Sequence, residues 1–275
     1  MSTEQKKTIL ITGSTDGIGL ATARMLASMG HQVLLHGRNP TKLEEVEKAL
    51  AALTGDGQVE IYVADLSLIA NVEALAKAVA EKHNKLDVLI NNAGVYNALN
   101  PITKDGLDVR FVVNAIAPYL LTQRLLPLLG TSGRVINLSS AAQSTVNPKA
   151  LTGQVSLSDG AAYAQSKLAL TMWSRSLGLS LKEQGIAIIA VNPGSLLGSK
   201  MVKQAFGVSG GDIRIGAEIL SRAALADEFA TASGQYFDND SGNFASPHPD
   251  ALNPHKSQEI LRIIEKILAD RVIAL

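Results

Sequence analysis

Residues 8–19 read Thr-Ile-Leu-Ile-Thr-Gly-Ser-Thr-Asp-Gly-Ile-Gly. A short aliphatic run ends in a turn with three glycines, and a helical pattern begins near residue 17. In this context backbone amides and a helix N-terminus can bind a pyrophosphate. We expect Gly13 to permit the tight turn, Gly17 to admit the phosphates and Gly19 to let the helix approach the strand. The glycine spacing is wider than in the common dinucleotide fingerprint, so a purely structural turn is the alternative at this point.

The rest of the chain continues the alternation of strand and helix. This is typical of an α/β protein with a doubly wound parallel sheet and helices on both faces. No linker, charge block or repeat interrupts the pattern, so residues 1–275 are predicted to form one domain. Polar stretches at 141–160, 195–211 and 238–255 are interpreted as loops, the first two as substrate loops, and 238–275 as a C-terminal extension. Strands are expected at 8–12, 32–36, 59–64, 86–91, 133–139, 186–191 and 234–237, and helices at 17–29, 40–53, 69–83, 105–129, 161–184, 212–226 and 256–269.

Composition excludes several classes of function. The 25 basic and 25 acidic side chains leave no net charge to attract nucleic acid or an anionic membrane. Cysteine is absent, which excludes disulfides, thiolate nucleophiles and cysteine-ligated metals, and the five histidines lack metal-ligand spacing. The polar first seven residues and the short apolar run after them do not resemble a signal peptide or a spanning helix. We expect a cytoplasmic protein with no metal site and no nucleic-acid or membrane partner.

The end of the second expected strand predicts which dinucleotide is bound. A doubly wound fold contacts the adenosine ribose about twenty residues after the glycine turn, where this chain reads His36-Gly37-Arg38-Asn39. Gly37 stands where an acidic residue would accept the ribose hydroxyls, and Arg38 can pair with a 2′-phosphate. We therefore expect NADP(H) to be preferred and NAD(H) to remain usable; a solvated loop arginine is the alternative. Asp65, after the third strand, could meet the adenine edge or cap the next helix.

Two asparagines and two small residues, Asn91-Asn92-Ala93-Gly94, end the fourth expected strand. Small residues at a strand exit suit a ligand that lies against the backbone, and amides can tie neighbouring strands together. We interpret Ala93 and Gly94 as cofactor contacts and the asparagines as largely structural.

Polar groups also gather at the end of the fifth expected strand, which finishes with Ser139-Ser140, and on the next helix, which reads Tyr163-Ala164-Gln165-Ser166-Lys167. Tyr163 and Lys167 are four residues apart and share a helical face. A free tyrosine titrates near pH ~10, and a nearby ammonium favours the phenolate. We expect Lys167 to lower the pKa of Tyr163 and make it a general acid or base. Taken alone, the pair is as well explained as a surface pair.

Taken in order, these motifs resemble the short-chain dehydrogenase/reductase family over roughly residues 7–240. The resemblance implies a Rossmann-like sheet of about seven strands and NAD(P)-dependent carbonyl or alcohol chemistry. It implies that Tyr163 donates or accepts the proton, that Lys167 binds the ribose and lowers the Tyr163 pKa, and that Ser140 holds the substrate oxygen. Ser139 would be a sheet-edge hydroxyl. The matching motifs are the 12–19 turn, Asp65, Asn91 to Gly94, Asn114, Ser140, Tyr163, Lys167 and Asn192-Pro193-Gly194.

The same resemblance assigns the remaining site residues. Asn114 resembles the residue that bends its helix and holds a proton-relay water, which is compatible with a buried asparagine at a kink near Pro118. Pro193 and Gly194 resemble the turn against the nicotinamide. The expected cofactor-binding residues are Gly13, Ser14, Thr15, Asp16, Gly17, Ile18, Gly19, Arg38, Asn39, Asp65, Leu66, Asn92, Ala93, Gly94, Tyr163, Lys167, Pro193, Gly194 and Leu196.

The chain departs from the family pattern in two places. Family members often carry a threonine shortly after the Pro-Gly turn, whereas residues 195–199 read Ser-Leu-Leu-Gly-Ser, so a hydroxyl contact must come from Ser199 or be absent. The long spacing between Ser140 and Tyr163, together with residues 36–39, resembles the retinol-dehydrogenase-like branch. We expect this chain to lack the membrane anchor often seen there, so the resemblance does not by itself imply retinoid chemistry.

The sequence predicts an oxidoreductase that transfers a hydride between NADP(H) and a ketone, aldehyde or alcohol. The alternative is a catalytically silent dinucleotide-binding regulatory protein on the same fold. The intact set of Ser140, Tyr163, Lys167 and Asn114 favours the enzyme. An epimerase or dehydratase of nucleotide sugars would require a larger C-terminal domain. Helices 105–129 and 161–184 are expected to pair across a two-fold axis and form a homodimer or homotetramer.

Overall fold

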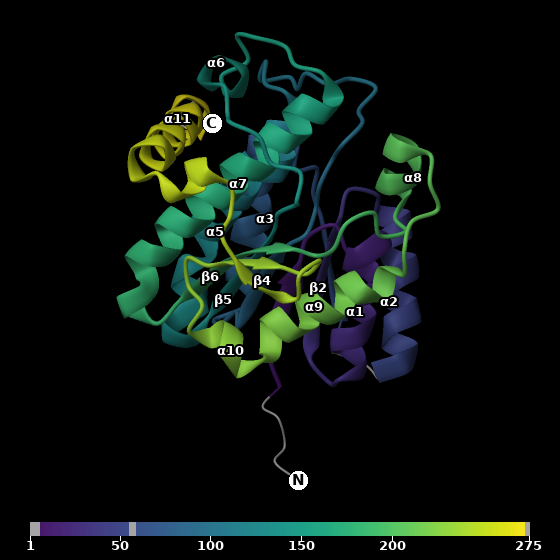
Figure 1. The fold of residues 1–275 in the computed structure, drawn as a ribbon. Helices are drawn as coiled ribbons and strands as arrows, with labels where there is room; N and C mark the ends of the chain where they lie inside the picture. The colour runs from purple at the N-terminus through teal and green to yellow at the C-terminus, as the bar shows by residue number, and fades with distance from the viewer. Residues whose placement is uncertain (1–5, 55–58, 273–275) are drawn as a thin grey trace.

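The computed structural model describes residues 6–54 and 59–272. Eight strands form one sheet in the order β3-β2-β1-β4-β5-β6-β7-β8 (Figure 1). The pairs from β3 to β7 are parallel, and β8 is antiparallel to β7. The predicted doubly wound α/β fold is confirmed, but the expected seven-stranded sheet has an eighth, antiparallel edge strand. The strands are Thr8–Ile11, Gln32–Gly37, Val59–Val63, Val88–Asn91, Arg134–Leu138, Ala187–Asn192, Tyr236–Asp238 and Asn243–Ala245.

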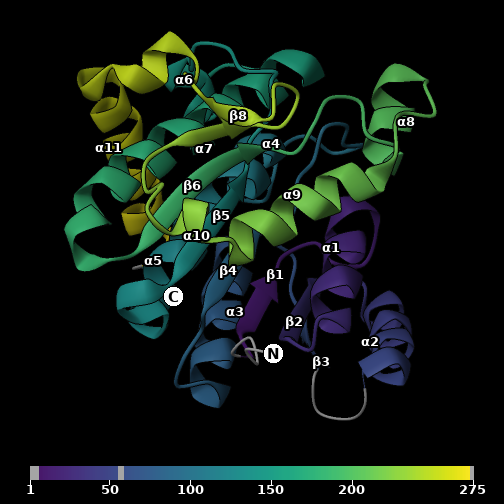
Figure 2. The same ribbon diagram turned by 60° about the horizontal axis from the view of Figure 1, so that its bottom comes forward.

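Helices cover both faces of the sheet, and each face has its own hydrophobic core. Alternate residues of a strand point to opposite faces, so Leu10 joins one core while Ile9 and Ile11 join the other. Figure 2 shows the two helical layers on either side of the strands. One layer holds α1 (Gly17–Ser28), α2 (Pro40–Thr54), α9 (Ile213–Leu225) and α10 (Asp227–Ala230); the other holds α3 (Ile69–Lys82), α5 (Ala117–Leu129), α7 (Asp159–Leu181) and α11 (Pro254–Val272).

Three short helical segments differ from the predicted loops and helices. The segments 141–160 and 195–211 were expected to be loops, but they contain α6 (Pro148–Leu151) and α8 (Lys200–Phe206). The helix expected at 105–129 begins with α4 (Val109–Phe111) and continues through a π-helical turn, Val112–Ile116, into α5. The irregularity is therefore centred on Asn114, whereas Pro118 lies in the first turn of α5, where a proline is tolerated.

The C-terminal helix α11 packs against α7 and contributes four buried residues, Ile260, Ile264, Ile267 and Leu268, to that core. Tyr119 of α5 donates a hydrogen bond of 2.9 Å to Glu265 of α11. The helix pair that was expected to form a subunit interface is therefore partly covered by the chain's own extension. Among the described residues, the segment Val109–Ser132 is long and apolar enough to span a membrane, but 72% of its most apolar window is buried in the protein, as in a core helix.

Candidate active site

The glycine turn follows β1 and is fixed by bonds from neighbouring strands. Gly13 has φ +66°, which favours glycine, and its amide donates to Nδ1 of His36 at 3.1 Å. His36 Nε2 bonds the carbonyl of Ala64 at 3.1 Å, so the ring is a neutral imidazole that donates from Nε2. Burial lowers the pKa of His36 to about 4. The hydroxyl of Ser14 is also used internally, since it bonds the backbone amide and carbonyl of His36.

The glycine turn packs closely against the segment after β4 and leads into the N-terminus of α1. A Cβ on Gly19 would lie 2.3 Å from the Gly13 carbonyl oxygen and 2.4 Å from Asn92 Nδ2, so only glycine allows this close approach. The side chain of Asp16 caps α1 by accepting from the Gly17 amide at 2.8 Å. The amides at the N-terminus of α1 are thereby presented at the carboxyl edge of the sheet, where such a turn binds phosphate. Ile18 packs partly buried against the core.

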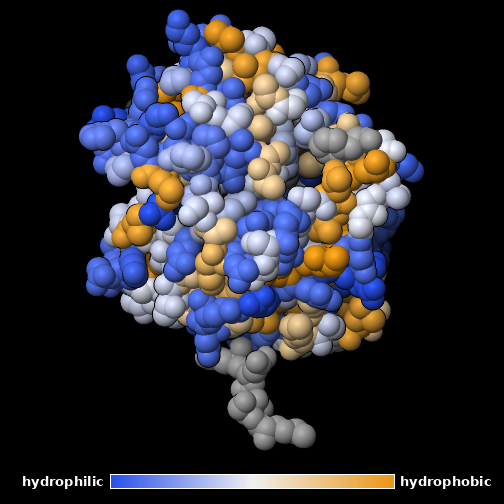
Figure 3. Space-filling model, viewed as in Figure 1, coloured by the Kyte–Doolittle hydropathy of each residue, from blue (hydrophilic) through white to orange (hydrophobic). Residues whose placement is uncertain are grey.

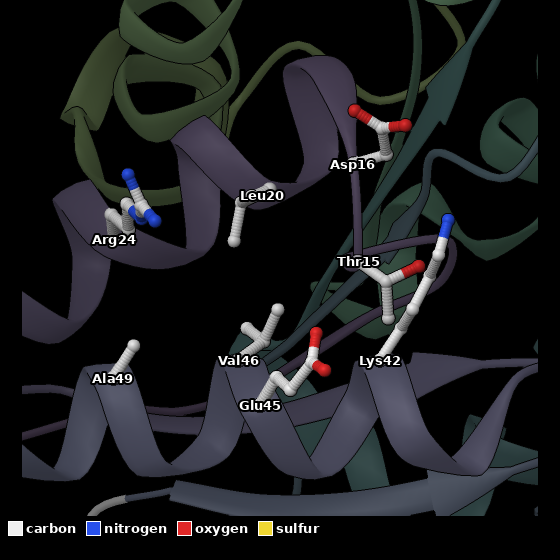
Figure 4. A pocket seen from close by; sticks show the side chains of 8 residues that line it. All are labelled: Thr15, Asp16, Leu20, Arg24, Lys42, Glu45, Val46 and Ala49. Carbon is white, nitrogen blue, oxygen red and sulfur yellow. The ribbon is translucent and has the colours of Figure 1, made fainter.

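At the ribose end of the site, position 37 has no room for an acidic side chain that would bind the ribose hydroxyls. A Cβ on Gly37 would lie 2.7 Å from Thr15 Cγ2. Arg38 is exposed, and Asn39 caps α2 by accepting from the Lys42 amide at 3.0 Å. Beside Thr15, between α1 and α2, lies a pocket of about 320 Å³. In Figure 4 the amine of Lys42 extends toward the end of the pocket formed by Thr15 and Asp16. The residues that line the pocket are Thr15, Asp16, Leu20, Arg24, Lys42, Glu45, Val46 and Ala49.

Asp65 and Leu66 lie on the segment that follows β3. Asp65 accepts from the amide and hydroxyl of Ser67 at 3.0 and 2.8 Å. The N-cap of α3 is Leu68, which makes no side-chain capping bond, so the expectation that Asp65 caps this helix is wrong. The Leu66 side chain is buried in the core, and only its backbone is free to meet a cofactor.

The segment after β4 joins the two halves of the site. Asn92 Nδ2 donates to the carbonyls of Thr12 and Gly13 at 2.8 and 3.0 Å, which agrees with the structural role expected for it. A Cβ on Gly94 would lie 3.5 Å from Asn114 Oδ1 and 3.7 Å from Lys167 Nζ. Gly94 therefore borders the space between the glycine turn and the Tyr163 face, as expected for a cofactor contact.

Tyr163, from the first part of α7, meets Ser140 at the end of β5. Burial raises the pKa of Tyr163; an interaction with the Ser140 side chain opposes the rise, and Tyr96 adds to it. The Ser139 hydroxyl points elsewhere, to Thr171 at 2.6 Å. Of the two serines, Ser140 is therefore the one placed for chemistry. The pKa of Tyr163 is therefore raised, in the direction opposite to the lowered value expected beside Lys167, because desolvation of the phenolate is the largest effect.

Lys167 is buried beneath Tyr163. Its Nζ lies 5.7 Å from the centre of the Tyr163 ring and donates to the carbonyl of Leu138 at 2.6 Å. Burial lowers its pKa to about 8, so the ammonium is charged at neutral pH and titrates just above it. At neutral pH the site therefore combines a protonated phenol with a buried cation.

Asn114 has its amide fully used by protein groups. It accepts from the Val95 amide at 2.8 Å and donates to the Val95 carbonyl and the Ser166 hydroxyl, both at 2.9 Å. Ser166 in turn donates to the Tyr163 carbonyl at 2.7 Å. Through these bonds, the π-helical turn that precedes α5 is connected to the segment after β4 and to α7. The proton-relay water expected at Asn114 stays a prediction.

The turn after β6 is held by the β7–β8 hairpin. Pro193 accepts from Asn239, and Ser195 bonds Asp240 through its amide and hydroxyl at 2.8 and 2.5 Å. Leu196 has φ +51°, a strained conformation for a residue with a side chain, and it is half exposed. Ser199 caps α8 by accepting from the Val202 amide. Its Cβ would lie 3.8 Å from a Cβ on Gly17, which places Ser199 near the glycine turn.

The structure thus gathers the predicted residues along the carboxyl ends of β1, β2, β4, β5 and β6. Sequence reasoning missed four groups that shape the site: His36 as the clamp on Gly13, Asp240 behind the Pro-Gly turn, and Tyr96 and Arg110 beside Tyr163. Each of these four groups contacts a site residue or its neighbour that lies far away in the sequence. No local sequence pattern therefore indicates the contact. Among the described residues, no group of three or more His, Asp or Glu side chains could hold a metal ion.

Comparison with known proteins agrees with this geometry. A sequence profile described as short chain dehydrogenase matches residues 7–207. The chain belongs to the short-chain dehydrogenase family. Bovine retinol dehydrogenase 12 is 34% identical to it over 278 residues, covering 96% of this chain and 87% of that protein. Human retinol dehydrogenase 13 is 31% identical over 258 residues, covering 84% and 76%. The chain lies in the retinol-dehydrogenase-like branch of the family, whose members use NAD(P).

Solved structures of family members share the fold. A protein from Mycobacterium paratuberculosis superposes with a TM-score of 0.79 at 27% identity, covering 96% of this chain and 93% of that one. A metagenomic short-chain oxidoreductase in complex with NADP gives a TM-score of 0.64 at 30% identity, covering 82% of this chain and 94% of that one. The family assignment makes the chain an oxidoreductase.

Proposed function

We propose that the chain transfers a hydride between NADP(H) and a ketone, aldehyde or alcohol, with Tyr163 as the group that exchanges the proton. The observation that carries the proposal is the place of the Tyr163 phenol, which interacts with the Ser140 side chain and whose ring centre lies 5.7 Å from Nζ of the buried Lys167. A catalytically silent binder on the same fold has no evident need for a partly buried phenol beside Ser140 at this edge.

Ser140, Tyr163 and Lys167 have separate roles in the proposed reaction. A bound nicotinamide dinucleotide supplies or accepts the hydride. Ser140 and the Tyr163 hydroxyl would together hold the substrate oxygen, and the neutral phenol donates its proton to that oxygen as the carbonyl is reduced. The raised pKa of Tyr163 keeps the phenol protonated at neutral pH, which is the form that donates a proton when a carbonyl is reduced. Lys167 adds a positive charge below the site and would bind the ribose.

NADP(H) preference is supported by the ribose end of the site. Thr15 leaves no room for a side chain at Gly37, which removes the carboxylate that would favour NAD. Arg38 is exposed and makes no ion pair among the residues that the structure describes, so its guanidinium is available to a 2′-phosphate. Lys42, at the mouth of the neighbouring pocket, adds a second cation.

An apolar substrate is supported by the loops around the site. The exposed side chains of Leu99 and Ile102 follow β4, Val155 follows β5, and Leu196 and Val208 follow β6. Figure 3 shows hydrophobic surface beside α8. These groups lie on segments that follow the carboxyl ends of neighbouring strands, and exposed apolar groups on such segments favour a ligand with an apolar body. Two relatives are named retinol dehydrogenase and a third, human, polyprenol dehydrogenase, and substrates of this chemical kind are proposed here.

A carbonyl and alcohol panel read by nicotinamide absorbance tests the proposal. Aldehydes and ketones with short and long apolar chains are offered with NADPH and NADH, and the corresponding alcohols with NADP⁺ and NAD⁺. We expect NADPH-dependent reduction that improves with chain length. Tight NADPH binding without turnover on the whole panel would favour the silent binder. Cytoplasmic location and a homodimer or homotetramer stay predictions, and sedimentation of the full chain tests the latter.

A further inference from the structure

Arg110 is a buried arginine one helical turn ahead of Asn114, and its side chain is only 1% exposed. Its Nε and Nη2 donate to both carboxylate oxygens of Asp108, at 2.8 and 2.6 Å. Its Nη1 donates to the carboxylate of Asp159 and to the Tyr96 carbonyl, the latter at 3.4 Å. A guanidinium without water needs partners for its donors, and here all three nitrogens have them.

These partners come from three segments that border the site. Asp108 caps α4, Tyr96 follows the Ala93-Gly94 contact, and Asp159 is the first residue of α7, one turn ahead of Tyr163. The Tyr96 ring packs on the Tyr163 ring with centroids 4.9 Å apart and planes at 45°. Arg110 therefore joins the residue that contacts the Tyr163 ring to the helical turn that carries Tyr163.

The first turn of α7 is shaped to accept this contact. A Cβ on Gly160 would lie 3.1 Å from the Tyr96 hydroxyl, so the glycine lets Tyr96 cross the helix closely, and a larger residue would have to displace that hydroxyl. On the other side of Tyr163, Ser166 bonds its carbonyl and is itself held by Asn114. Tyr163 is thus fixed from the N-terminal side by Arg110 and Asp159 and from the C-terminal side by Asn114 and Ser166.

The Arg110 guanidinium does not need Asp159 to neutralise its charge. Asp108 already pairs the guanidinium with two short hydrogen bonds, whereas the Asp159 side chain is 52% exposed. Half-exposed ion pairs contribute little to stability. A small displacement of a catalytic group, however, can lower a rate strongly. The effect of losing Asp159 is therefore expected in geometry at Tyr163 and not in folding.

We propose that the Arg110–Asp159 link is a positioning device that holds the first turn of α7 and the Tyr96 ring so that the Tyr163 hydroxyl stays on Ser140. The proposal rests on the proposed function of Tyr163. Arg110 and Asp159 are positioning residues, since they touch Tyr163 only through Tyr96 and the α7 backbone.

Asp159→Asn is the test variant, because it removes the charge and keeps Asp108 to pair the buried arginine. Glu73→Gln is the matched control, since it breaks the bidentate Glu73–Arg124 pair between α3 and α5, away from the site. We expect Asp159→Asn to lower kcat about tenfold, with the KM for NADPH within about twofold of the parent. Glu73→Gln should keep the parent kcat, and both variants should keep the parent melting temperature.

Two further readouts separate positioning from a merely structural role. In a Tyr163→Phe background, Asp159→Asn should cause no further loss of turnover, because the group it positions is gone. Hydrogen exchange of the cofactor-free proteins should be faster in residues 160–167 of Asp159→Asn, with the rest of α7 unchanged.

An Asp159→Asn kcat within about twofold of the parent, or equal losses in both backgrounds, would overturn the proposal. So would unchanged exchange in residues 160–167. A parent with no turnover on the carbonyl panel would instead reject the proposed function, and the exchange measurement would still decide whether the link orders this turn.

Discussion

Around the glycine turn, side chains are bonded to backbone atoms of neighbouring segments, whereas around Tyr163 functional groups meet one another. His36 accepts from the Gly13 amide, and Asn92 donates to the Thr12 and Gly13 carbonyls. At the other end, the Tyr163 phenol interacts with the Ser140 side chain, and its ring lies over the Lys167 ammonium. The first region is defined by the path of its backbone, and the second by a few titratable atoms.

This difference predicts different consequences of substitution. A change in the glycine turn alters the shape of the chain, so cofactor binding and stability should fall together. A change at Tyr163 removes a functional group and little packing, so turnover should fall alone. The predictions below test whether the two regions can be separated in this way, from the largest expected effect to the smallest.

Gly19→Ala should abolish measurable NADPH binding and lower the melting temperature, because the new Cβ would overlap the Gly13 carbonyl oxygen at 2.3 Å. Fluorescence titration and thermal unfolding measure both effects. Gly211→Ala is the control, since a Cβ there meets only Leu197 Cδ2 at 3.9 Å, and it should behave as the parent. A Gly19→Ala protein with parent-like affinity would show that the turn does not approach the strand as closely as described.

Lys167→Met should lower turnover by about 10²-fold and also weaken NADPH binding, because the residue belongs to both regions. Steady-state kinetics and cofactor titration separate the two losses. Lys200→Met, at an exposed pair with Asp16, serves as the control for removal of a lysine. If binding stays intact while turnover falls, Lys167 acts only on the chemistry, and the two regions are more separate than proposed.

Acidification should destabilise the glycine turn through His36. The pKa of His36 is lowered from 6.5 to about 4 in the folded protein, so the unfolded state binds the proton at higher pH. The stability that the neutral ring contributes is complete above pH 6.5 and is lost as the pH falls toward 4; between pH 7 and 5 the loss is about 2 kcal/mol. Urea unfolding at both pH values measures it. The drop should shrink in His36→Gln, and an equal drop in this variant would assign it to other groups.

Arg38→Leu should weaken NADPH binding about tenfold and leave NADH binding within about twofold, because only NADPH carries the 2′-phosphate. Titration with each cofactor gives the ratio. Arg24→Leu, which removes an arginine of α1 that lines the neighbouring pocket, is the matched control. Equal losses for the two cofactors, or tighter parent binding of NADH, would reject Arg38 as the phosphate partner.

The sequence was sufficient for the strong periodic elements and for the order of the motifs, so the doubly wound sheet and the glycine turn could be predicted. Strand β8 and helices α6 and α8 are three to seven residues long, too short to leave a period in polar segments. They were therefore interpreted as loops. The π-helical turn contains Asn114, whose side chain bonds the backbone of Val95, nineteen residues away, and no local sequence pattern predicts this contact.

The sequence indicated that Tyr163 and Lys167 lie close together, but it did not indicate the direction in which the pKa of Tyr163 is shifted. Spacing alone placed Lys167 beside Tyr163 and suggested a lowered phenol pKa. Burial is a property of the whole fold, and it acts on both groups in the direction that favours their neutral forms. Arg110 was overlooked for the same reason, since its partner Asp159 lies 49 residues away.

The most direct test of the central claim is Tyr163→Phe, which removes one oxygen and little packing. Steady-state kinetics, NADPH titration and thermal unfolding of this variant would be compared with the parent. The account predicts a fall in turnover of about 10²-fold or more, with NADPH affinity within about twofold and an unchanged melting temperature. Retention of more than about half of the activity, or a loss of turnover that follows a loss of NADPH binding, would contradict it.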